Sequence, residues 1–210
     1  MNLLLNLLAV SATVLGSGMA LPQARRLART RRIEGISATW IGVSVAINGW
    51  WIAYAVAAQI WVLLPVSIIS VALYITIGVF YVATVGRSAV PGLLIGSVGL
   101  GMVPLPVLVG GGWALAGVAV GLCYGLQLLP AVVAACRTRV LAGISPATWI
   151  IAWVEAVLWL GYGIGVADAA LIAGGAVGTA MATLILVRLA VTGHRPMQSL
   201  RVPSLGLLAR

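Results

Sequence analysis

Seven long stretches of almost uninterrupted apolar residues follow one another along the chain, separated by short polar or glycine-rich gaps. They are 3–21, 38–58, 61–85, 90–109, 112–130, 147–166 and 168–191. Each is close to the roughly 20 residues that a helix needs to cross about 30 Å of hydrocarbon. The stretches are apolar on every face and are too long for the alternating, roughly ten-residue strands of a membrane β-barrel. The pattern therefore predicts seven transmembrane helices.

Composition supports the same class. Of the 210 residues, 62% are hydrophobic and only 7% are charged, whereas about a quarter of a soluble domain is charged. A soluble enzyme, a disordered chain and a secreted disulfide scaffold are therefore excluded. The net charge of +9 does not indicate a nucleic-acid partner, because the basic residues stand in gaps between apolar stretches and not on a water-exposed face. Cys123 and Cys136 suggest no disulfide framework.

The positions of the basic residues predict how the chain crosses the membrane. All of them are arginines, and they lie at or after the ends of the first, third, fifth and seventh stretches, whereas the gaps after the second, fourth and sixth contain none. Short loops rich in arginine stay on the cytoplasmic side. The positive charges follow the first stretch and do not precede it, so we do not expect a cleaved signal peptide. The sequence predicts a multi-pass protein of the cell membrane with its N-terminus outside and its C-terminus in the cytoplasm.

The chain also contains an internal repeat. Residues 21–37 (LPQARRLARTRRIEGIS) and 129–145 (LPAVVAACRTRVLAGIS) share eight identities at a constant offset of 108, and the same offset pairs Trp51 with Trp159 and Tyr54 with Tyr162. Because the fourth stretch reverses the chain between the copies, both copies have the same orientation. We expect an all-α integral membrane protein of seven transmembrane helices, arranged as two parallel three-helix bundles joined by a linker helix. The predicted boundaries are 1–88 for the first bundle, 89–111 for the linker, 112–192 for the second bundle and 193–210 for a cytoplasmic tail.

The repeated loop, with Leu-Pro-Gln at the inner end of the first span and Arg-Thr-Arg and Glu-Gly-Ile-Ser after it, resembles the PQ-loop repeat. The order of three, one and three spans is similar to that of the SWEET sugar transporters. The resemblance implies an alternating-access transporter for a small polar solute, with a sugar as the implied substrate. The same clan contains amino-acid and organic-acid carriers and a retrieval receptor. Another carried solute, or a non-transporting membrane receptor or assembly protein, therefore remains an alternative.

Carried over residue by residue, the resemblance implies three groups of functional positions. Substrate would stack on the two tryptophans, the prolines of the motif with the neighbouring glutamine would form hinges, and a tyrosine of each repeat with one aspartate would form an outer gate. These residues are Trp51 and Trp159; Pro22, Gln23 and Pro130; Tyr54, Tyr162 and Asp168. The chain departs from the family pattern where a sugar-binding asparagine is expected, since Ser67 and Gly175 occupy those positions.

Polar residues inside the apolar stretches point to a cavity independently of any family. Glu155 lies near the middle of 147–166, where a charged side chain costs a few kcal/mol. Glu155, Trp159 and Tyr162 share one helical face, and Ser44, Asn48 and Trp51 have the same spacing in the first repeat. A third face carries Ser67, Ser70, Tyr74 and Tyr81 at helical spacing. Trp40 lies near a span end, a position typical of the membrane interface. The predicted substrate-binding residues are Trp51, Trp159, Asn48, Glu155, Ser67 and Ser70.

Two roles for Glu155 remain open at this point. It could bind a proton or the solute as the cavity alternates its access, which would give proton-coupled transport, or it could be a neutral group hydrogen-bonded to a neighbouring helix. The chain shows no nucleophile with a histidine and an acid, no metal-ligand cluster and no phosphate loop, so we expect no enzyme activity, metal or cofactor. Membrane lipid is an expected partner, and the protein could be a monomer or a homo-oligomer.

Overall fold

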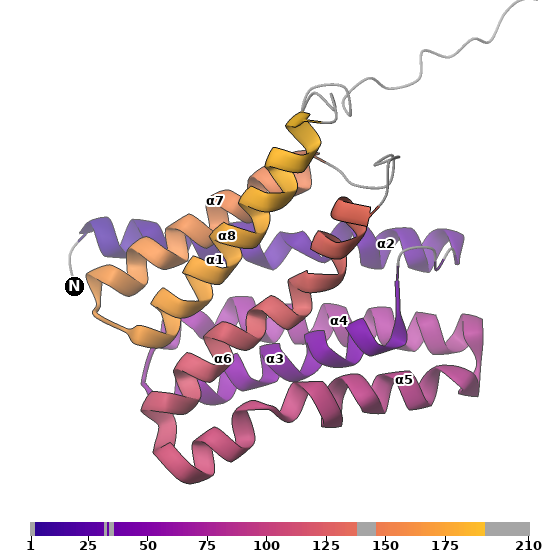
Figure 1. Ribbon diagram of the computed structural model, residues 1–210, viewed down its shortest axis with the longest axis horizontal. Coiled ribbons are helices and arrows are strands. Elements are labelled where there is room, and N and C mark those ends of the chain that lie inside the picture. Colours follow the sequence, from indigo (N-terminus) through magenta and orange to yellow (C-terminus); the bar gives the residue numbers. More distant parts are fainter. Residues whose placement is uncertain (1–2, 32, 34–35, 138–145, 192–210) are drawn as a thin grey trace, which may run out of the picture.

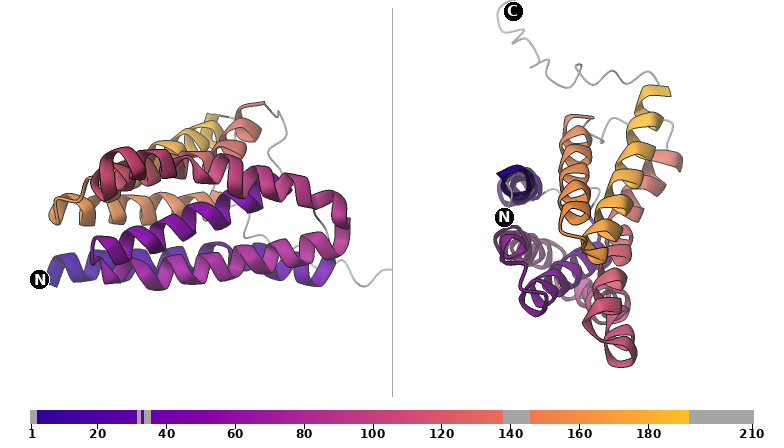
Figure 2. Two further views of the ribbon diagram at one scale, coloured as in Figure 1. Left: turned by 90° about the horizontal axis from the view of Figure 1, so that it is seen from below. Right: turned by 90° about the vertical axis from the view of Figure 1, so that its left-hand side faces the viewer.

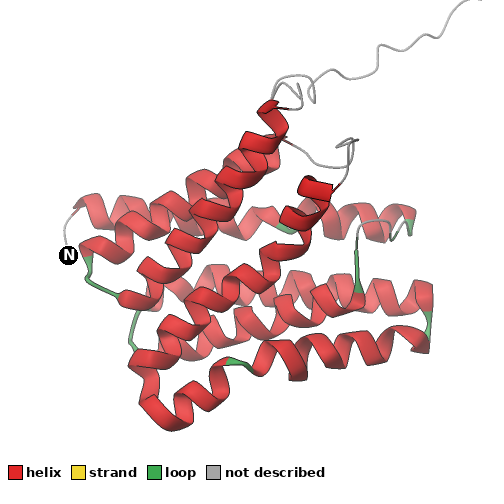
Figure 3. Ribbon diagram, viewed as in Figure 1, coloured by secondary structure: helices red, strands yellow, loops and turns green. Residues whose placement is uncertain are grey.

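The structure is a computed structural model, which describes residues 3–31, 33, 36–137 and 146–191 (Figure 1). Within these residues every regular element is a helix, short loops join the helices, and there is no strand (Figure 3). The longer helices are α1 (Leu3–Met19), α2 (Leu21–Thr30), α3 (Ala38–Ala57), α4 (Leu64–Val85), α6 (Pro104–Arg137), α7 (Pro146–Gly165) and α8 (Ala169–Val191). The short elements are η1 (Trp61–Leu63), η2 (Arg87–Ala89), α5 (Val90–Leu94), the π-helical η3 (Ile95–Gly99) and η4 (Leu100–Met102). The prediction of an all-α protein is confirmed.

In the part of the chain that the structure describes, five helical segments are long and apolar enough to cross a membrane. They are Ala38–Ala57, Trp61–Val85, Arg87–Val133, Pro146–Gly165 and Ala169–Val191, and Leu3–Met19 is a shorter apolar helix. Many large apolar side chains on these helices face outward, among them Val79 at 62% and Ile164 at 62% exposure. The chain is therefore a helical bundle with the character of a multi-pass membrane protein.

The segment Arg87–Val133 does not form one straight rod. Its 47 residues would extend about 70 Å as a straight helix, more than twice the thickness of a hydrocarbon core of about 30 Å. At Gly112 the backbone leaves the helical region (φ 69°, ψ −172°), a conformation that favours glycine. Figure 1 shows the chain turning back near the end of the bundle that holds the N-terminus, so that the later part of α6 runs opposite to α5.

The helices alternate in direction. In Figure 1, α1, α4, α6 beyond Gly112 and α8 run away from the end that holds the N-terminus, whereas α3 and α7 return toward it. α4 packs against both α1 and α3, and α8 packs against both α6 and α7. The two sets also contact each other crosswise, α1 with α7 and α3 with α6. Figure 2 (right) views α1, α3 and α4 nearly end-on from the N-terminal end.

The turns that follow α3 and α7 have the same backbone hydrogen bonds, at positions 108 residues apart. After α3, Ile60 N–H donates to Ala55 O (2.9 Å) and Gln59 N–H to Val56 O (3.3 Å); after α7, Asp168 N–H donates to Gly163 O (2.9 Å) and Ala167 N–H to Ile164 O (3.2 Å). This pair of bonds closes a helix with one left-handed residue. Gln59 (φ 58°) and Ala167 (φ 55°) are those residues. The sequence repeat is thus also a repeat of backbone conformation.

The left-handed residues of these turns give a prediction about stability. A side chain in this conformation costs roughly 1–2 kcal/mol that glycine avoids. We expect Ala167→Gly to raise the free energy of unfolding by about 1 kcal/mol, measured by chemical unfolding in detergent micelles. The control is Ala169→Gly, two residues further along at the right-handed start of α8, which should leave stability unchanged or lower it. A loss of stability in Ala167→Gly would contradict the turn geometry.

Glycines bring α3 very close to the segment that precedes Gly112. A Cβ atom on Gly96 would collide with the Thr39 carbonyl, one on Gly42 with the Leu93 carbonyl, and one on Gly101 with the Ala46 side chain. The Trp50 indole donates to Gly101 O (2.9 Å) and packs edge-on against Trp113 (6.4 Å between ring centroids). This segment is therefore fixed to the side of α3.

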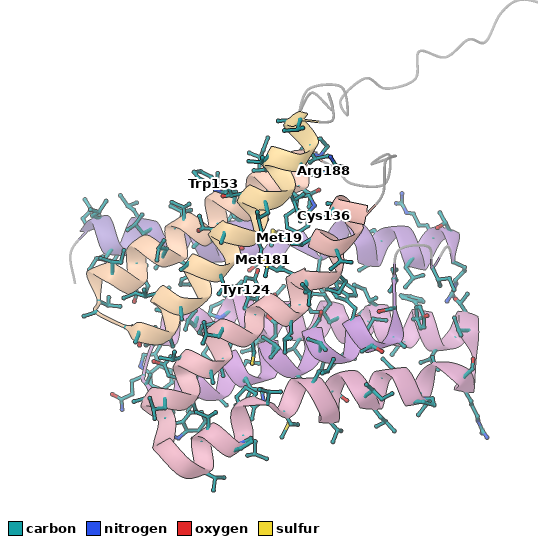
Figure 4. All side chains as sticks on the ribbon, in the orientation of Figure 1. Met19, Tyr124, Cys136, Trp153, Met181 and Arg188 are labelled. Atoms are coloured by element: carbon teal, nitrogen blue, oxygen red, sulfur yellow. The ribbon has the colours of Figure 1, made fainter. Side chains whose placement is uncertain are left out.

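The described arginines lie toward the end of the bundle opposite the N-terminus. Arg25, Arg29 and Arg31 belong to α2 and its C-terminal cap, Arg87 follows α4, and Arg188 is in the last turn of α8. Figure 4 labels Arg188 at that end. The tail 193–210 and the second copy of the loop motif at 138–145 lie outside the described residues. The described positive charges therefore share one side of the bundle.

Candidate functional site

A cavity of about 90 Å³ lies between the helices, and α1, α3, α4, α6, α7 and α8 all contribute to its lining. Figure 4 labels two lining residues, Met19 and Tyr124, near the centre of the bundle in that view. The lining residues are Gly16, Met19, Ala20, Asn48, Trp51, Leu63, Val66, Ser67, Ser70, Tyr74, Tyr124, Gln127, Glu155, Ala156, Trp159, Leu171, Gly174 and Gly175. No residue of the segment between α4 and Gly112 is among them.

The structure brings all six of the sequence-predicted substrate-binding residues to this one cavity. Asn48 and Trp51 come from α3, Ser67 and Ser70 from α4, and Glu155 and Trp159 from α7. Glu155 and Ser67 are buried, at 7% and 3% exposure. Side chains as far apart in sequence as Ser70 and Glu155 therefore face a common space.

Glu155 lies against α1 and beside its own tryptophan. The Trp159 indole N–H donates to Glu155 Oε1 (3.1 Å). A Cβ atom on Gly16 would lie 2.5 Å from the same oxygen and 2.9 Å from Val66, so only glycine leaves room for the carboxyl group there. The sequence placed Glu155 and Trp159 on one face, and the hydrogen bond follows directly from their spacing of four residues.

A second cluster of polar side chains lies on the cavity wall. It connects three helices, and Gln127 is at its centre. Its amide nitrogen donates to Tyr74 Oη (2.8 Å), and its Oε1 lies 3.5 Å from the Asn48 amide nitrogen. Asn48 also donates to Ser44 O (2.8 Å), and the Trp40 indole donates to the Gln127 carbonyl (3.0 Å). Gln127 is 6% exposed. This chain of hydrogen bonds fixes the orientation of the polar wall formed by α3, α4 and α6.

Gln127 and Tyr124 also line the cavity, although neither was among the predicted site residues. The signal that could have found them is their position inside the apolar stretch 112–130, three residues apart and therefore on one helical face. Trp40, whose position near a span end suggested the membrane interface, instead packs edge-on against Tyr74 (5.4 Å between centroids). Tyr81, predicted on the same face as Ser67 and Ser70, packs in an apolar cluster with Ile77 and does not line the cavity.

The paired aromatic residues have matching geometry in the two repeats. The rings of Trp51 and Tyr54 are 6.1 Å apart at 78°, and those of Trp159 and Tyr162 are 6.0 Å apart at 80°. The Trp51 ring lies over Gly174 of α8, where a Cβ atom would approach it to 2.9 Å. The small-residue face of α8 therefore serves close packing, as expected for glycines between membrane helices, and also makes room for the cavity's aromatic wall.

The predicted outer-gate residues gather where α3 and α7 end. Tyr54 Oη donates to Asp168 Oδ2 (2.7 Å), and Asp168 Oδ1 accepts from Leu171 N (2.9 Å). The second contact is an N-cap of α8. Tyr162 is buried at 4% exposure in the last turn of α7, six residues before Asp168. The Tyr54–Asp168 bond connects the two sets of helices beyond Trp51 and Trp159, on the side of the cavity nearer the N-terminus.

The predicted hinge residues lie in different backbone settings. The helix breaks at Ala20 (φ −82°, ψ −13°), and Pro22 occupies the first turn of α2 with Gln23 after it. Pro130 lies inside α6, which continues through it to Arg137; the non-helical residue within that helix is Gly112. A helix boundary thus lies beside Pro22, whereas α6 does not end at Pro130. The hinge role of the two prolines stays a prediction.

The described residues contain no group of three or more His, Cys, Asp and Glu side chains that could hold a metal ion. Chemically, the site offers aromatic faces, amide and hydroxyl groups, and one carboxyl group in a space shared by two sets of helices. In comparisons with known proteins, no protein-family model matches the chain, and no curated protein matches it.

Proposed function

We propose that the protein is an alternating-access membrane carrier for a small polar solute. The observation that carries the proposal is the cavity into which both repeats direct a tryptophan, with Trp51 and Trp159 on its wall together with amide, hydroxyl and carboxyl groups. A solute site between two repeats near the middle of the bilayer is the plan of many transporters. The Tyr54–Asp168 hydrogen bond (2.7 Å) would close one entrance in the conformation described here.

The proposal includes seven spans in the order three, one and three. The reversal at Gly112 supports two crossings within Arg87–Val133, and the crosswise packing of α1 on α7 and α3 on α6 supports two equivalent bundles. The alternating helix directions support copies of the same orientation. With the arginine-bearing end in the cytoplasm, as the positive-inside rule requires, the N-terminus is outside and the Tyr54–Asp168 contact faces outward.

The resemblance to the PQ-loop repeat and the SWEET transporters belongs to the same proposal. It rests on the loop motif and on the 108-residue offset, which the paired turns at Gln59 and Ala167 support. Sugars are the solutes that this resemblance implies. Ser67 lines the cavity and Gly175 lies against Leu160 of α7, so neither position offers the amide group expected from the family.

Uptake into proteoliposomes tests the proposal. A panel of sugars, amino acids and organic ammonium compounds should include at least one solute whose flux depends on the protein. For that solute we expect Trp51→Ala/Trp159→Ala to lower the initial rate at least about tenfold, because each ring supplies a stacking face worth roughly 1 kcal/mol or more. Trp153→Ala is the control, since Trp153 is 36% exposed and bonds to Thr183 away from the cavity. Absence of flux across the whole panel would refute the proposal.

The alternative is a receptor or assembly protein that uses the same scaffold without transport. That alternative predicts a tightly packed interior, and the cavity favours transport over it. A protein of this kind would keep its partner binding in the Trp51→Ala/Trp159→Ala variant and would show no solute flux in either form.

A further inference from the structure

The two repeats contribute equivalent tryptophans to the cavity but different polar side chains. At the offset of 108, Glu155 corresponds to Ile47, which is fully buried, and Asn48 corresponds to Ala156. Glu155 is the only acidic residue among the lining residues, and none of the lining residues is basic. The chain contains no lysine at all. An ionised Glu155 would therefore have no positive partner on the cavity wall.

Aromatic rings line the same cavity as this carboxyl group. Trp51, Trp159, Tyr74 and Tyr124 all line the cavity, and they come from four different helices. Aromatic faces attract organic cations through the negative potential of their π systems, and cages of such rings recognise ammonium groups. A single carboxylate among four aromatic rings is thus complementary to one positive charge on an apolar or weakly polar body.

We infer that the solute is a small organic ammonium ion, whose charged nitrogen pairs with Glu155 between the aromatic rings while its polar end faces the Asn48–Gln127 wall. The inference rests on the proposed carrier function and specifies its substrate. A buried carboxylate without a partner is strongly unfavourable, so in the empty cavity Glu155 holds a proton. Binding of the cation breaks the carboxyl O–H bond and releases that proton to water, which leaves the carboxylate paired with the ammonium group.

The same carboxyl group would couple the flux of the ammonium ion to an opposite flux of protons. One ammonium ion replaces one proton on each entry, and one proton replaces the ammonium ion on release, so the exchange moves no net charge. A conformational change with Glu155 ionised and alone would bury an unpaired charge. The carrier should therefore change its access only when a proton or a cation neutralises Glu155.

Among the residues that the structure describes, Glu155 has the only carboxyl group that lines the cavity, and the other ionisable groups nearby can be named helix by helix. Tyr74 of α4 and Tyr124 of α6 line the same cavity as Glu155. α1, which packs against α7, has no ionisable residue along Leu3–Met19, and the ionisable residue of α8 is Arg188 in its last turn, where it donates to Ala135 O (3.1 Å). Asp168 is bonded to Tyr54 and the start of α8 and does not line the cavity.

Choline binding to the full-length protein in detergent tests the inference, with 3,3-dimethyl-1-butanol as a neutral probe of the same shape. Over the pH interval in which the free carboxyl group is protonated, we expect choline affinity to rise about tenfold per pH unit, because one proton leaves for each cation bound. The neutral probe should bind weakly and without this pH dependence. Ethanolamine distinguishes a primary from a quaternary ammonium head.

Variants of Glu155 assign the effect to this residue. Glu155→Gln should weaken choline binding about a hundredfold, as expected for loss of a buried charge partner, and should abolish the pH dependence, whereas Glu155→Asp keeps a carboxyl group and should keep it. Thermal unfolding shows whether each variant folds. In wild-type protein alone, choline affinity that is independent of pH, or equal affinity for the neutral probe, overturns the inference. Protein-dependent flux of a neutral sugar without choline binding overturns it too but leaves the carrier proposal intact, whereas absence of all flux overturns both.

Discussion

Replacing Gly96 by alanine is expected to destabilise the folded protein by about 3 kcal/mol, since extra methyl groups in a tightly packed interface typically cost 1–3 kcal/mol and sometimes more. The added Cβ atom would collide with the Thr39 carbonyl and lie 2.9 Å from Val43 N. Both are backbone atoms of α3, which cannot move away as a flexible side chain can. Chemical unfolding in detergent micelles measures the change.

Gly99 supplies the control for this variant. It lies three residues further along in the same π-helical turn, and a Cβ atom there would meet no atom within 4 Å. Gly99→Ala should therefore change the free energy of unfolding by less than about 1 kcal/mol. Equal losses in the two alanine variants would mean that α3 and this segment are not in the close contact described.

Removing the Tyr54 hydroxyl group is expected to open the cavity toward the N-terminal side. A hydrogen bond to a charged group is worth about 1.5–3 kcal/mol, which corresponds to a shift of roughly tenfold to a hundredfold in the ratio of open to closed protein. The Tyr54–Asp168 bond links α3 to the start of α8, and it must break when these helices separate. Tyr54→Phe should accordingly raise the fraction of protein open at that end.

Thiol labelling measures this shift. Cys123 and Cys136 are free thiols, so the background carries Cys123→Ala and Cys136→Ser, and Ser70→Cys reports access to the cavity. A membrane-impermeant reagent added on the N-terminal side should label the Tyr54→Phe protein faster. Tyr81→Phe is the matched control, because Tyr81 packs in an apolar cluster that includes residues of α2, α3 and α4, and it does not line the cavity. If the two phenylalanine variants label at the same rate, the hydrogen bond does not hold the entrance closed.

The helices were predictable from the sequence because their signal is local. Each apolar stretch is uninterrupted, and bounds such as Ala38–Ala57 and Ala169–Val191 agree with the predicted 38–58 and 168–191 within a residue. The helix bounds in the region 90–130 were harder to predict. Its break was expected between 109 and 112, but the intervening residues stay helical up to a single glycine with a positive φ, Gly112, and composition alone does not reveal that conformation.

The cavity was predictable where the repeat and helical periodicity coincide, as for Trp51, Trp159 and Glu155. Gln127 was missed because its importance depends on contacts with Tyr74 and Asn48, which are 53 and 79 residues away in sequence. Trp40 was assigned to the membrane interface by its place near a span end, whereas its indole is held by the Gln127 carbonyl. Contacts between distant helices depend on how the helices cross. The crossing geometry cannot be predicted from the local residue pattern of a single sequence.

The mismatch between Glu155 and its counterpart Ile47 has a consequence for how such a molecule can be assembled. Two copies of the second half, paired with each other, would bring two carboxyl groups into one small space, where like charges repel; two copies of the first half would bring none. Covalent fusion of the unlike halves guarantees a single acid in every molecule, a stoichiometry that free association of separate subunits would leave to chance.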